Sequence, residues 1–376
     1  MTESEPGASS NLPRGPRGYE LGNPQLDETI RQLVADAADG THPDLIAEMI
    51  VTVLRLHRDK ASRGDLKLIN TALKEMRYSL LVFGRHFEPK VTIFGSARIP
   101  PDDPNYHLAT EFGRLMAEKG WGVITGAGPG IMEAGAQGAE RERAYGVNIR
   151  LPFEADANRY LSPERTVNYK YFFTRKLTFV KESAAFALFP GGFGTLDEAF
   201  ELFTLMQTGK SDLHPVVLLE APGTGYWQPL LDFLGDVLAA RGLISPPDLN
   251  LFRTMASADD AVDHILSFYS NYHSQRFVEG RLVLRLHHPP SAQLVTQLNQ
   301  DFSDLLASGR IELVEPSNQE VADSDALDLA RLALNFDRHS FGRLRQLIDR
   351  LNEMVETPEK VEPPAPFDEE QAERPW

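Results

Sequence analysis

The segment that decides the fold reads PGGFGTLDE, from Pro190 to Glu198. An apolar run from Ala184 to Phe189 precedes it and predicts a buried strand, and apolar residues at helical spacing follow it. A strand, a loop with three glycines and a helix N-terminus form an anion site, because free backbone N–H groups and the positive end of the helix dipole converge there. A phosphate beside Glu198 would be repelled, so we expect Glu198 to face a neutral part of the same ligand.

The same segment also has a purely structural interpretation. Thr195 to Glu198 fit the S/T-x-x-E capping box, in which the two side chains close the helix N-terminus. A simple cap does not need three glycines, and the Pro-Gly-Gly-x-Gly prefix indicates close approach of a ligand to the backbone. Both interpretations stay open, since one carboxylate can serve both.

Strands and helices alternate on both sides of this segment. The pattern predicts an α/β fold with a doubly wound parallel sheet of the Rossmann type, whose short apolar strands are covered by helices on both faces. Strands are expected at 91–95, 121–125, 147–151, 184–189 and 216–220, and helices at 108–119, 131–143, 173–181, 196–207 and 227–241. The expected strand order is 3-2-1-4-5.

Three strand-to-helix loops are unusual. Gly95 to Arg98 follows the first strand, Gly126 to Gly130 the second, and the opening segment the fourth. In the expected order the first and fourth strands flank the switch point, so all three loops line one crevice. The second loop lacks the third glycine of GxGxxG, since position 131 is Ile, and it follows the wrong strand for NAD binding.

The regions outside the sheet predict further parts. Apolar residues between Leu26 and His86 recur at three and four, which indicates two or three helices. From Arg281 a βαββα pattern resembles part of a ferredoxin-like or ACT-like module, a small α+β domain. The expected parts are a disordered tail at 1–25, helices at 26–88, the Rossmann-like domain at 89–275, the small domain at 276–356 and an acidic, Pro-rich tail at 357–376. In the small domain, strands are expected at 281–286, 310–314 and 330–335, and helices at 292–307 and 341–351.

Composition excludes several classes of function. The 376 residues carry 38 basic and 54 acidic side chains, a formal charge of −16, which disfavours a nucleic-acid partner. The chain has no cysteine, which excludes disulfides and thiolate chemistry. We expect no signal peptide, no membrane span and a cytoplasmic location. His287 and His288 lack a third ligand, so we expect no metal site, and no cofactor is expected.

Other polar and aromatic residues near the crevice have two interpretations each. Arg175 and Lys176 fit a solvated helix face or a segment that crosses the crevice. Glu133 suits the first turn of a helix or a ligand contact. The aromatic side chains between Tyr169 and Phe173 fit the core or a cover for a nucleobase.

Taken together, these segments resemble the LOG family of nucleoside 5′-monophosphate phosphoribohydrolases. The family pattern PGGxGTxxE appears from Pro190 to Glu198 without departure, and the Arg-Lys pair begins 23 positions before Glu198, the family's spacing. Gly126 to Glu133 matches the family's second glycine loop, with the ending of its type II branch. The resemblance covers about 89–272, and Ala127, where many members have Gly, departs from it.

The resemblance implies hydrolysis of the N-glycosidic bond of a nucleoside monophosphate, AMP or a cytokinin-type nucleotide, to free base and ribose 5-phosphate. It implies Glu198 as the carboxylate that acts on the sugar, and Arg175 as the catalytic partner that holds the ligand and keeps Glu198 ionised. A homodimer or larger even homo-oligomer is also implied. The expected substrate-binding residues are Gly95, Ser96, Gly128, Gly130, Glu133, Lys176, Gly191, Gly192, Gly194 and Thr195.

The same segments also bear on two other functions. The fold and phosphate loop also suit a carrier or sensor that binds a nucleotide or cofactor without hydrolysing it, as relatives that carry molybdenum cofactor do. Retention of both Arg175 and Glu198 favours the enzyme. The family's frequent label of lysine decarboxylase is rejected, because no lysine is set up to anchor pyridoxal phosphate.

Overall fold

The computed structural model describes residues 19–37, 42–150 and 158–355. The chain divides into two compact units between Leu73 and Lys74, within helix α3 (Arg63–Phe83). The expected tails at 1–25 and 357–376 lie outside the described residues, apart from residues 19–25. The predicted domain limits therefore stay predictions.

The first unit is helical, as the pattern at three and four predicts. It contains α1 (Pro24–Ala37), α2 (Pro43–Arg58) and the first part of α3. Ile30 and Val34 of α1 pack against Val51 of α2, and all three are buried. A single small apolar cluster thus holds α1 and α2 together.

The second unit is built on a parallel sheet of seven strands, in the order β4-β3-β2-β1-β5-β6-β7. The strands are β1 (Lys90–Phe94), β2 (Gly122–Thr125), β3 (Ala144–Ile149), β4 (Thr166–Tyr169), β5 (Ala185–Leu188), β6 (Val216–Leu219) and β7 (Arg253–Met255). The five expected strands stand in the predicted order, with the switch point between β1 and β5. The doubly wound α/β fold is confirmed.

The edge strands β4 and β7 were not predicted. They have four and three residues, and their sequences TVNY and RTM lack the continuous apolar run of the central strands. An edge strand packs less of its surface than a central strand, so its sequence carries a weaker pattern. The third strand begins earlier than expected, because β3 runs from Ala144 to Ile149, and Leu151 lies outside the described residues.

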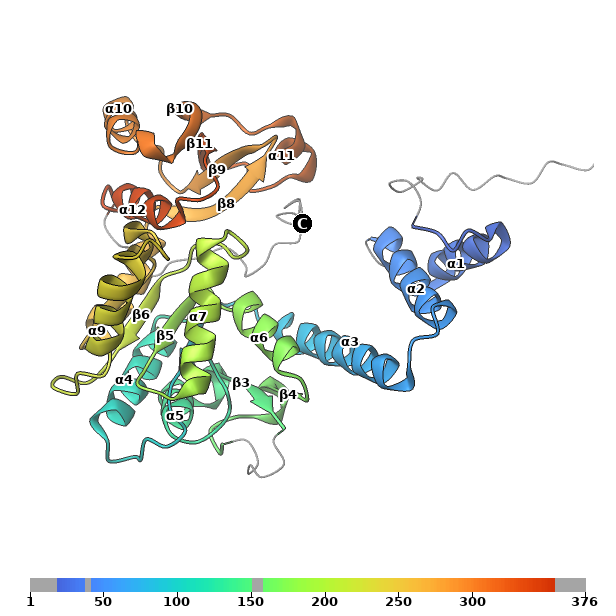
Figure 1. The fold of residues 1–376 in the computed structure, drawn as a ribbon, viewed down its shortest axis with the longest axis horizontal. Helices are drawn as coiled ribbons and strands as arrows, with labels where there is room; N and C mark the ends of the chain where they lie inside the picture. Colours follow the sequence, from blue (N-terminus) through green and yellow to red (C-terminus); the bar gives the residue numbers. More distant parts are fainter. Residues whose placement is uncertain (1–18, 38–41, 151–157, 356–376) are drawn as a thin grey trace, which may run out of the picture. The chain divides into compact units, whose positions relative to one another are not determined.

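Helices cover both faces of this sheet (Figure 1). The helices are α4 (Pro104–Glu118), α5 (Ile131–Arg143), α6 (Phe172–Lys181), α7 (Phe193–Gln207), α8 (Gln228–Asp232), which continues as a π-helix to Ala239, and α9 (Ala258–Phe268). Helices α4, α5 and α9 form one layer, with α4 packed between the other two. Right-handed crossovers run in opposite directions from β1 and β5, which places α7 on the other face.

Strand register brings the unusual loops to one level. Phe94 of β1 pairs with Leu188 of β5, and Ile93 pairs with Thr125 of β2. All three strands are parallel, so the segments that follow them leave the same edge of the sheet. The core beneath this edge is fully buried, including Val91, Ile93 and Val123.

The small domain contains an antiparallel sheet in the order β10-β11-β9-β8. Its elements are β8 (Tyr272–Val278), β9 (Arg281–Leu286), α10 (Ala292–Asp301), β10 (Leu306–Val314), α11 (Asn318–Asp323), β11 (Ala330–Phe336) and α12 (Phe341–Asn352). Strand β8 was not predicted, because its sequence YHSQRFV is polar; Gln275 and Arg276 are nevertheless buried. The helix expected at 292–307 ends at Asp301, since β10 begins at Leu306.

The small domain is tied to the parallel sheet domain through α12. The Asn352 side-chain oxygen accepts hydrogen bonds from the backbone N–H groups of Asn271 and Tyr272, and its side-chain nitrogen donates to the Phe268 carbonyl. All four residues are buried. A buried amide with its hydrogen bonds satisfied fixes the junction between α9 and β8.

Candidate active site

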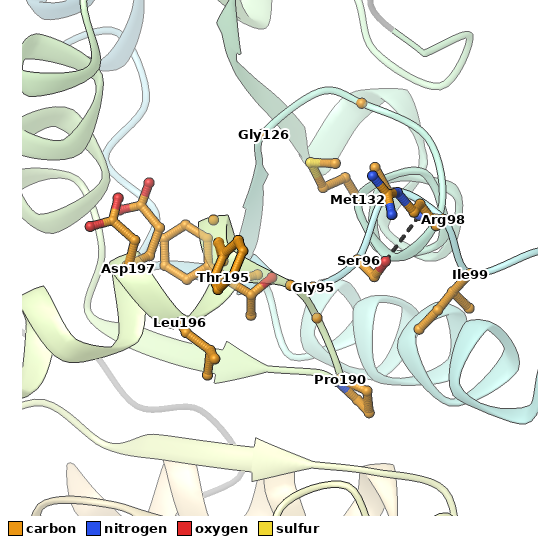
Figure 2. Close-up of a pocket in the computed structure, with 18 of the residues that line it drawn as sticks. Gly95, Ser96, Arg98, Ile99, Gly126, Met132, Pro190, Thr195, Leu196 and Asp197 are labelled. Carbon is orange, nitrogen blue, oxygen red and sulfur yellow. Dashed lines mark hydrogen bonds between the residues drawn. The ribbon is translucent and has the colours of Figure 1, made fainter. Parts of the chain in front are cut away.

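A cavity of about 900 Å³ opens at the edge of the sheet where β1, β2 and β5 end (Figure 2). Its volume lies within the range of pockets that bind small molecules. Described residues that line it include Phe94, Gly95, Ser96, Ala97, Arg98, Ile99, Gly126, Gly128, Pro129, Met132, Ile149, Phe172, Arg175, Tyr226 and the segment 190–198. The three glycine-containing loops therefore share one crevice, as the sequence predicts.

Ser96 connects the three loops through its backbone. Its N–H donates to the carbonyl of Pro190 (3.0 Å), in the loop after β5. Its own carbonyl accepts from the N–H of Ile131 (3.1 Å), at the start of α5. The Ser96 hydroxyl accepts from the backbone N–H of Arg98 (3.0 Å), which is drawn as the dashed line in Figure 2. The loop after β1 is thus fastened to both of its neighbours.

The loop after β2 is shaped by the protein's own packing. Gly130 has a φ of +67°, and a Cβ there would lie 2.3 Å from the carbonyl oxygen of Ser96. A Cβ at Gly128 would lie 2.7 Å from Cε of Met132. Ala127 is buried with a φ of +65°, a conformation that costs an L-residue about 1–2 kcal/mol. The departure from glycine at Ala127 therefore leaves a strained residue in this loop.

The loop after β5 has glycines of two kinds. A Cβ at Gly191 would lie 2.0 Å from Oγ1 of Thr195, so packing within the loop excludes a side chain there. A Cβ at Gly192 or Gly194 would meet no described atom within 4 Å, and neither residue has a positive φ. Neither packing nor backbone conformation requires glycine at these two positions. They lie open to the cavity, where a side chain would obstruct a ligand approaching the backbone.

Helix α7 starts inside this loop, which excludes the capping box, one of the two interpretations that the sequence left open. The helix begins at Phe193 with Gly192 as its N-cap, and no side chain caps it. Thr195 therefore lies in the first turn, where it packs on Gly191, and cannot act as the N-cap. The extended backbone of Gly192 allows this earlier start (φ −98°, ψ −155°). The first N–H groups of α7 are left for another acceptor, such as a bound anion.

Glu198 lies on α7 at the cavity wall and is partly buried. Burial raises the pKa of its carboxyl group from the ordinary 4.5 to about 7, and the cations of Arg175 and Lys176 offset this only in part. Arg175 favours the ionised form of Glu198, as expected, but desolvation outweighs the guanidinium and leaves the pKa above its ordinary value. Glu198 is poised to exchange a proton near pH 7.

Arg175 projects from α6 into the crevice and is held by backbone carbonyls. Its Nε donates to the carbonyl of Val147 (2.9 Å), and its Nη2 donates to that of Gly126 (3.4 Å). Its guanidinium also lies over the ring of Phe179, 5.2 Å from the centroid. A Cβ at Gly126 would lie 2.5 Å from Nη2, so this glycine makes room for the arginine.

Most of the predicted site residues line the cavity, and three do not. The lining includes Gly95, Ser96, Gly128, Arg175, Gly191, Gly192, Gly194, Thr195 and Glu198. Lys176 instead pairs with Asp197 and Glu201, at 2.9 Å each. Glu133 lies 3.7 Å from Nε of Arg159, and Gly130 packs behind Ser96. These three residues therefore contact other parts of the protein and do not line the cavity.

Several residues of the wall were not predicted as site residues. They include Arg98, Ile99, Met132, Ile149, Phe172 and Tyr226. Phe172, one of the aromatic residues that fit either the core or a cover for a nucleobase, is half exposed at the cavity. Tyr226 had an available signal, because it follows β6, the neighbour of β5 in the predicted order. The carboxyl end of that strand belongs to the same edge of the sheet.

No group of three His, Asp or Glu side chains in residues 19–37, 42–150 and 158–355 is arranged to hold a metal ion. Among the helices in these ranges, none has the length and apolar character needed to cross a bilayer.

Comparison with known proteins gives one family match. A family model described as possible lysine decarboxylase matches residues 127–265, which include the loops after β2 and β5, α6 and α7. The cytokinin riboside 5′-monophosphate phosphoribohydrolase LOG1 of Arabidopsis thaliana is 40% identical over 88 residues, which are 23% of this chain and 39% of that protein.

A longer match is to the bifunctional cytokinin biosynthesis protein of Fusarium pseudograminearum (strain CS3096). It is 28% identical over 271 residues, 65% of this chain and 53% of that protein. The chain thus spans about half the length of this relative, or less in the case of the plant protein. Among solved structures, the molybdenum cofactor binding protein of the phototrophic bacterium Rippkaea orientalis is 22% identical, covering 48% of this chain and 96% of that chain with a TM-score of 0.34.

Proposed function

The chain belongs to the LOG family, and from this premise we propose that it hydrolyses the N-glycosidic bond of nucleoside 5′-monophosphates to free base and ribose 5-phosphate. One observation carries the proposal. The cavity joins an uncapped helix N-terminus, at which Gly192 and Gly194 carry no side chain, to a carboxyl group whose pKa lies near 7. The first feature suits a phosphate and the second suits proton transfer to or from water.

The phosphate is proposed to bind at the start of α7. Gly192 and Gly194 expose their backbone there without a side chain, and the hydroxyl of Thr195 adds a donor within the first turn. A helix N-terminus stabilises an anion through both its N–H groups and its dipole. Binding energy at the phosphate positions the reacting sugar, so a nucleoside without the phosphate should be a poor substrate.

Glu198 is proposed to act on the attacking water. In its ionised form it accepts a proton as the water oxygen bonds to the anomeric carbon, and the bond between that carbon and the base nitrogen breaks. The electron pair stays on the base, which takes a proton from solvent. The sugar passes through an oxocarbenium-like state, which a nearby carboxylate stabilises. A base with a pKa near the working pH is well matched to this step.

Arg175 is proposed to hold the ligand and to adjust Glu198. A guanidinium group does not deprotonate in proteins, so it cannot donate a proton to the base. Its carbonyl partners, Val147 and Gly126, fix its position at the wall of the cavity. From there its charge lowers the pKa of Glu198 against the effect of burial. The result is a carboxyl group that still ionises in the neutral range.

The label of lysine decarboxylase does not fit the described cavity. Decarboxylation with pyridoxal phosphate requires a lysine that forms a Schiff base with the cofactor. Among the described residues that line the cavity there is no lysine. Lys176, the nearest in sequence to Arg175, is paired with two carboxylates of α7.

The substrate, the location and the oligomeric state are also proposals. We propose AMP or a cytokinin-type nucleotide as substrate, since relatives carry the name of cytokinin riboside 5′-monophosphate phosphoribohydrolase. We propose a cytoplasmic homodimer or larger even assembly, in which copies cover the exposed apolar side chains of α6 and α7, Phe173, Leu177 and Phe200. Light scattering of the purified chain would report a monomer if this assembly does not form.

The deciding experiment is incubation of the purified full chain with a panel of nucleoside monophosphates and detection of ribose 5-phosphate. We expect release from AMP or from an N6-substituted analogue, and much slower release from adenosine. Binding of AMP without any release across the panel would exclude hydrolysis of these nucleotides and leave a carrier or sensor role.

A further inference from the structure

We propose that Tyr226 is a positioning residue that sets the phosphate-binding backbone and thereby the preference for nucleotides over nucleosides. The inference rests on the proposed function, because it assigns a cause to the phosphate preference of the same site. Tyr226 lies between β6 and α8 and lines the cavity. It was not among the residues that the sequence singled out.

The hydroxyl of Tyr226 donates a hydrogen bond to the carbonyl oxygen of Gly191 (2.6 Å). The peptide that joins Gly191 to Gly192 is trans, so its carbonyl and its N–H point in opposite directions. Holding the carbonyl against Tyr226 therefore turns the N–H of Gly192 away from Tyr226. Gly192 is the N-cap of α7, where free N–H groups face an incoming anion.

Glycine makes this constraint necessary. Gly192 has no Cβ and a Cβ there would meet no described atom, so packing does not limit how its peptide rotates. Flexible glycine peptides lose more entropy on ordering than other residues do. A hydrogen bond that fixes the carbonyl before the ligand arrives removes part of this cost from binding.

Tyr226 is itself held by a carboxylate at the end of β6. Glu220 accepts hydrogen bonds from the backbone N–H groups of Tyr226 (2.5 Å) and Trp227 (3.2 Å) and from the hydroxyl of Thr224 (2.6 Å). The indole N–H of Trp227 donates to the carbonyl of Leu219 (3.1 Å), and this tryptophan is buried. The hydroxyl thus projects from a short loop that is anchored to the sheet.

The test is the Tyr226→Phe substitution in the full chain carrying Glu198→Gln, so that AMP is not consumed, with titration calorimetry of AMP and of adenosine. The variant removes one oxygen, so the fold and the aromatic packing are kept. We expect AMP to bind about tenfold more weakly, the size of one good hydrogen bond, while adenosine binding changes less than about twofold. The ratio of the two affinities does not depend on the fraction of folded protein.

Tyr106→Phe is the matched control. Its hydroxyl donates to Oε1 of Gln137 (3.0 Å), and neither residue lines the cavity. It should leave the ratio of AMP to adenosine affinity unchanged. If Tyr226→Phe also leaves that ratio unchanged, or weakens both ligands equally, the positioning role is overturned.

The two proposals fail separately. If the parent chain binds AMP and releases no ribose 5-phosphate, hydrolysis is excluded, while the affinity ratio of Tyr226→Phe still decides the role of Tyr226. If the parent chain binds AMP no better than adenosine, there is no phosphate preference for Tyr226 to set, and the inference is overturned.

Discussion

Two glycine-rich loops line the same cavity, and most of their glycines are required for different physical reasons. In the loop after β2, Gly126, Gly128 and Gly130 would each place a Cβ within 2.7 Å of another protein atom. In the loop after β5, Gly192 and Gly194 would place a Cβ in open space. Similar compositions therefore report close internal packing throughout one loop, and in the other a packed Gly191 followed by two glycines that give a ligand access.

The difference extends to the helices that the loops begin. Helix α5 starts at Ile131, whose N–H is already bonded to the carbonyl of Ser96, so its first turn is partly satisfied within the protein. Helix α7 starts without a side-chain cap and carries Glu198 on the cavity wall. The loop after β2 supports the site, and the loop after β5 is where we place the chemistry.

The largest effect should come from Glu198→Gln, which tests the chemistry assigned to the loop after β5. Removing a general base typically costs about 10²–10⁴-fold in rate, and we expect the rate of ribose 5-phosphate release to fall by that amount while AMP still binds. In the parent chain kcat/KM should rise as pH increases through about 7, because the ionised carboxylate is the active form.

Glu182→Gln is the control for this change. Glu182 is also a buried carboxylate in the same domain, but it pairs with Lys181 and does not line the cavity. It should retain the parent rate and pH profile. A Glu198→Gln variant that turns over AMP at the parent rate would contradict the mechanism.

The next effect concerns stability and the loop after β2. Gly130→Ala should lower the free energy of unfolding by about 2–4 kcal/mol, from the positive φ and the overlap with Ser96. Gly120→Ala is the matched variant, since Gly120 has a φ of +88° and no neighbour within 4 Å. Denaturant unfolding should show only about 1–2 kcal/mol for Gly120→Ala. Equal losses for both would mean that Ser96 gives way and the packing argument is wrong.

Part of this comparison could be predicted from the sequence. The alternation of apolar runs and helical patterns predicted the central strands and their order, because local periodicity and the topology of parallel sheets determine both. It did not predict β4, β7 or β8, whose short or polar sequences are ordered by their neighbours. Local pattern alone does not contain that information.

The site shows the same limit. Spacing placed Arg175 and Glu198 together, but it could not show where α7 begins, because a capping box and an early start at Phe193 fit the same letters. It also could not show that burial outweighs Arg175 at Glu198, since desolvation depends on the whole cavity wall. The positions of the glycines in the sequence did not show which glycines are closely packed and which are open to a ligand.

A smaller effect should distinguish a glycine that gives a ligand access from a glycine that packing requires. Gly194→Ala should weaken AMP binding by about 10–100-fold, because a methyl group would lie where the phosphate approaches and would displace one or two charge-assisted hydrogen bonds. Its thermal midpoint should not fall, since alanine is favourable in a helix and meets no atom there. Gly235→Ala, also open and outside the cavity lining, should leave AMP affinity unchanged. A loss of stability in Gly194→Ala without a loss of affinity would reverse the assignment of the two loops.

The smallest effect is a pH dependence of the free energy of unfolding that comes from Glu198, beside the loop after β5. Between about pH 4.5 and 7 the folded chain holds a proton on Glu198 that the unfolded chain has released. The contribution of this group to the free energy of unfolding is therefore highest below about pH 4.5 and falls as pH rises towards 7.

Glu198→Gln removes this ionisable group, so the free energy of unfolding of the variant should rise relative to that of the parent chain as pH increases through that window. The gain should be on the order of 1 kcal/mol, because the carboxyl group is only partly buried and water screens it. Denaturant unfolding of both chains at pH 5 and pH 8 measures it, and a constant difference between them would mean that the carboxyl group is not desolvated in the folded protein.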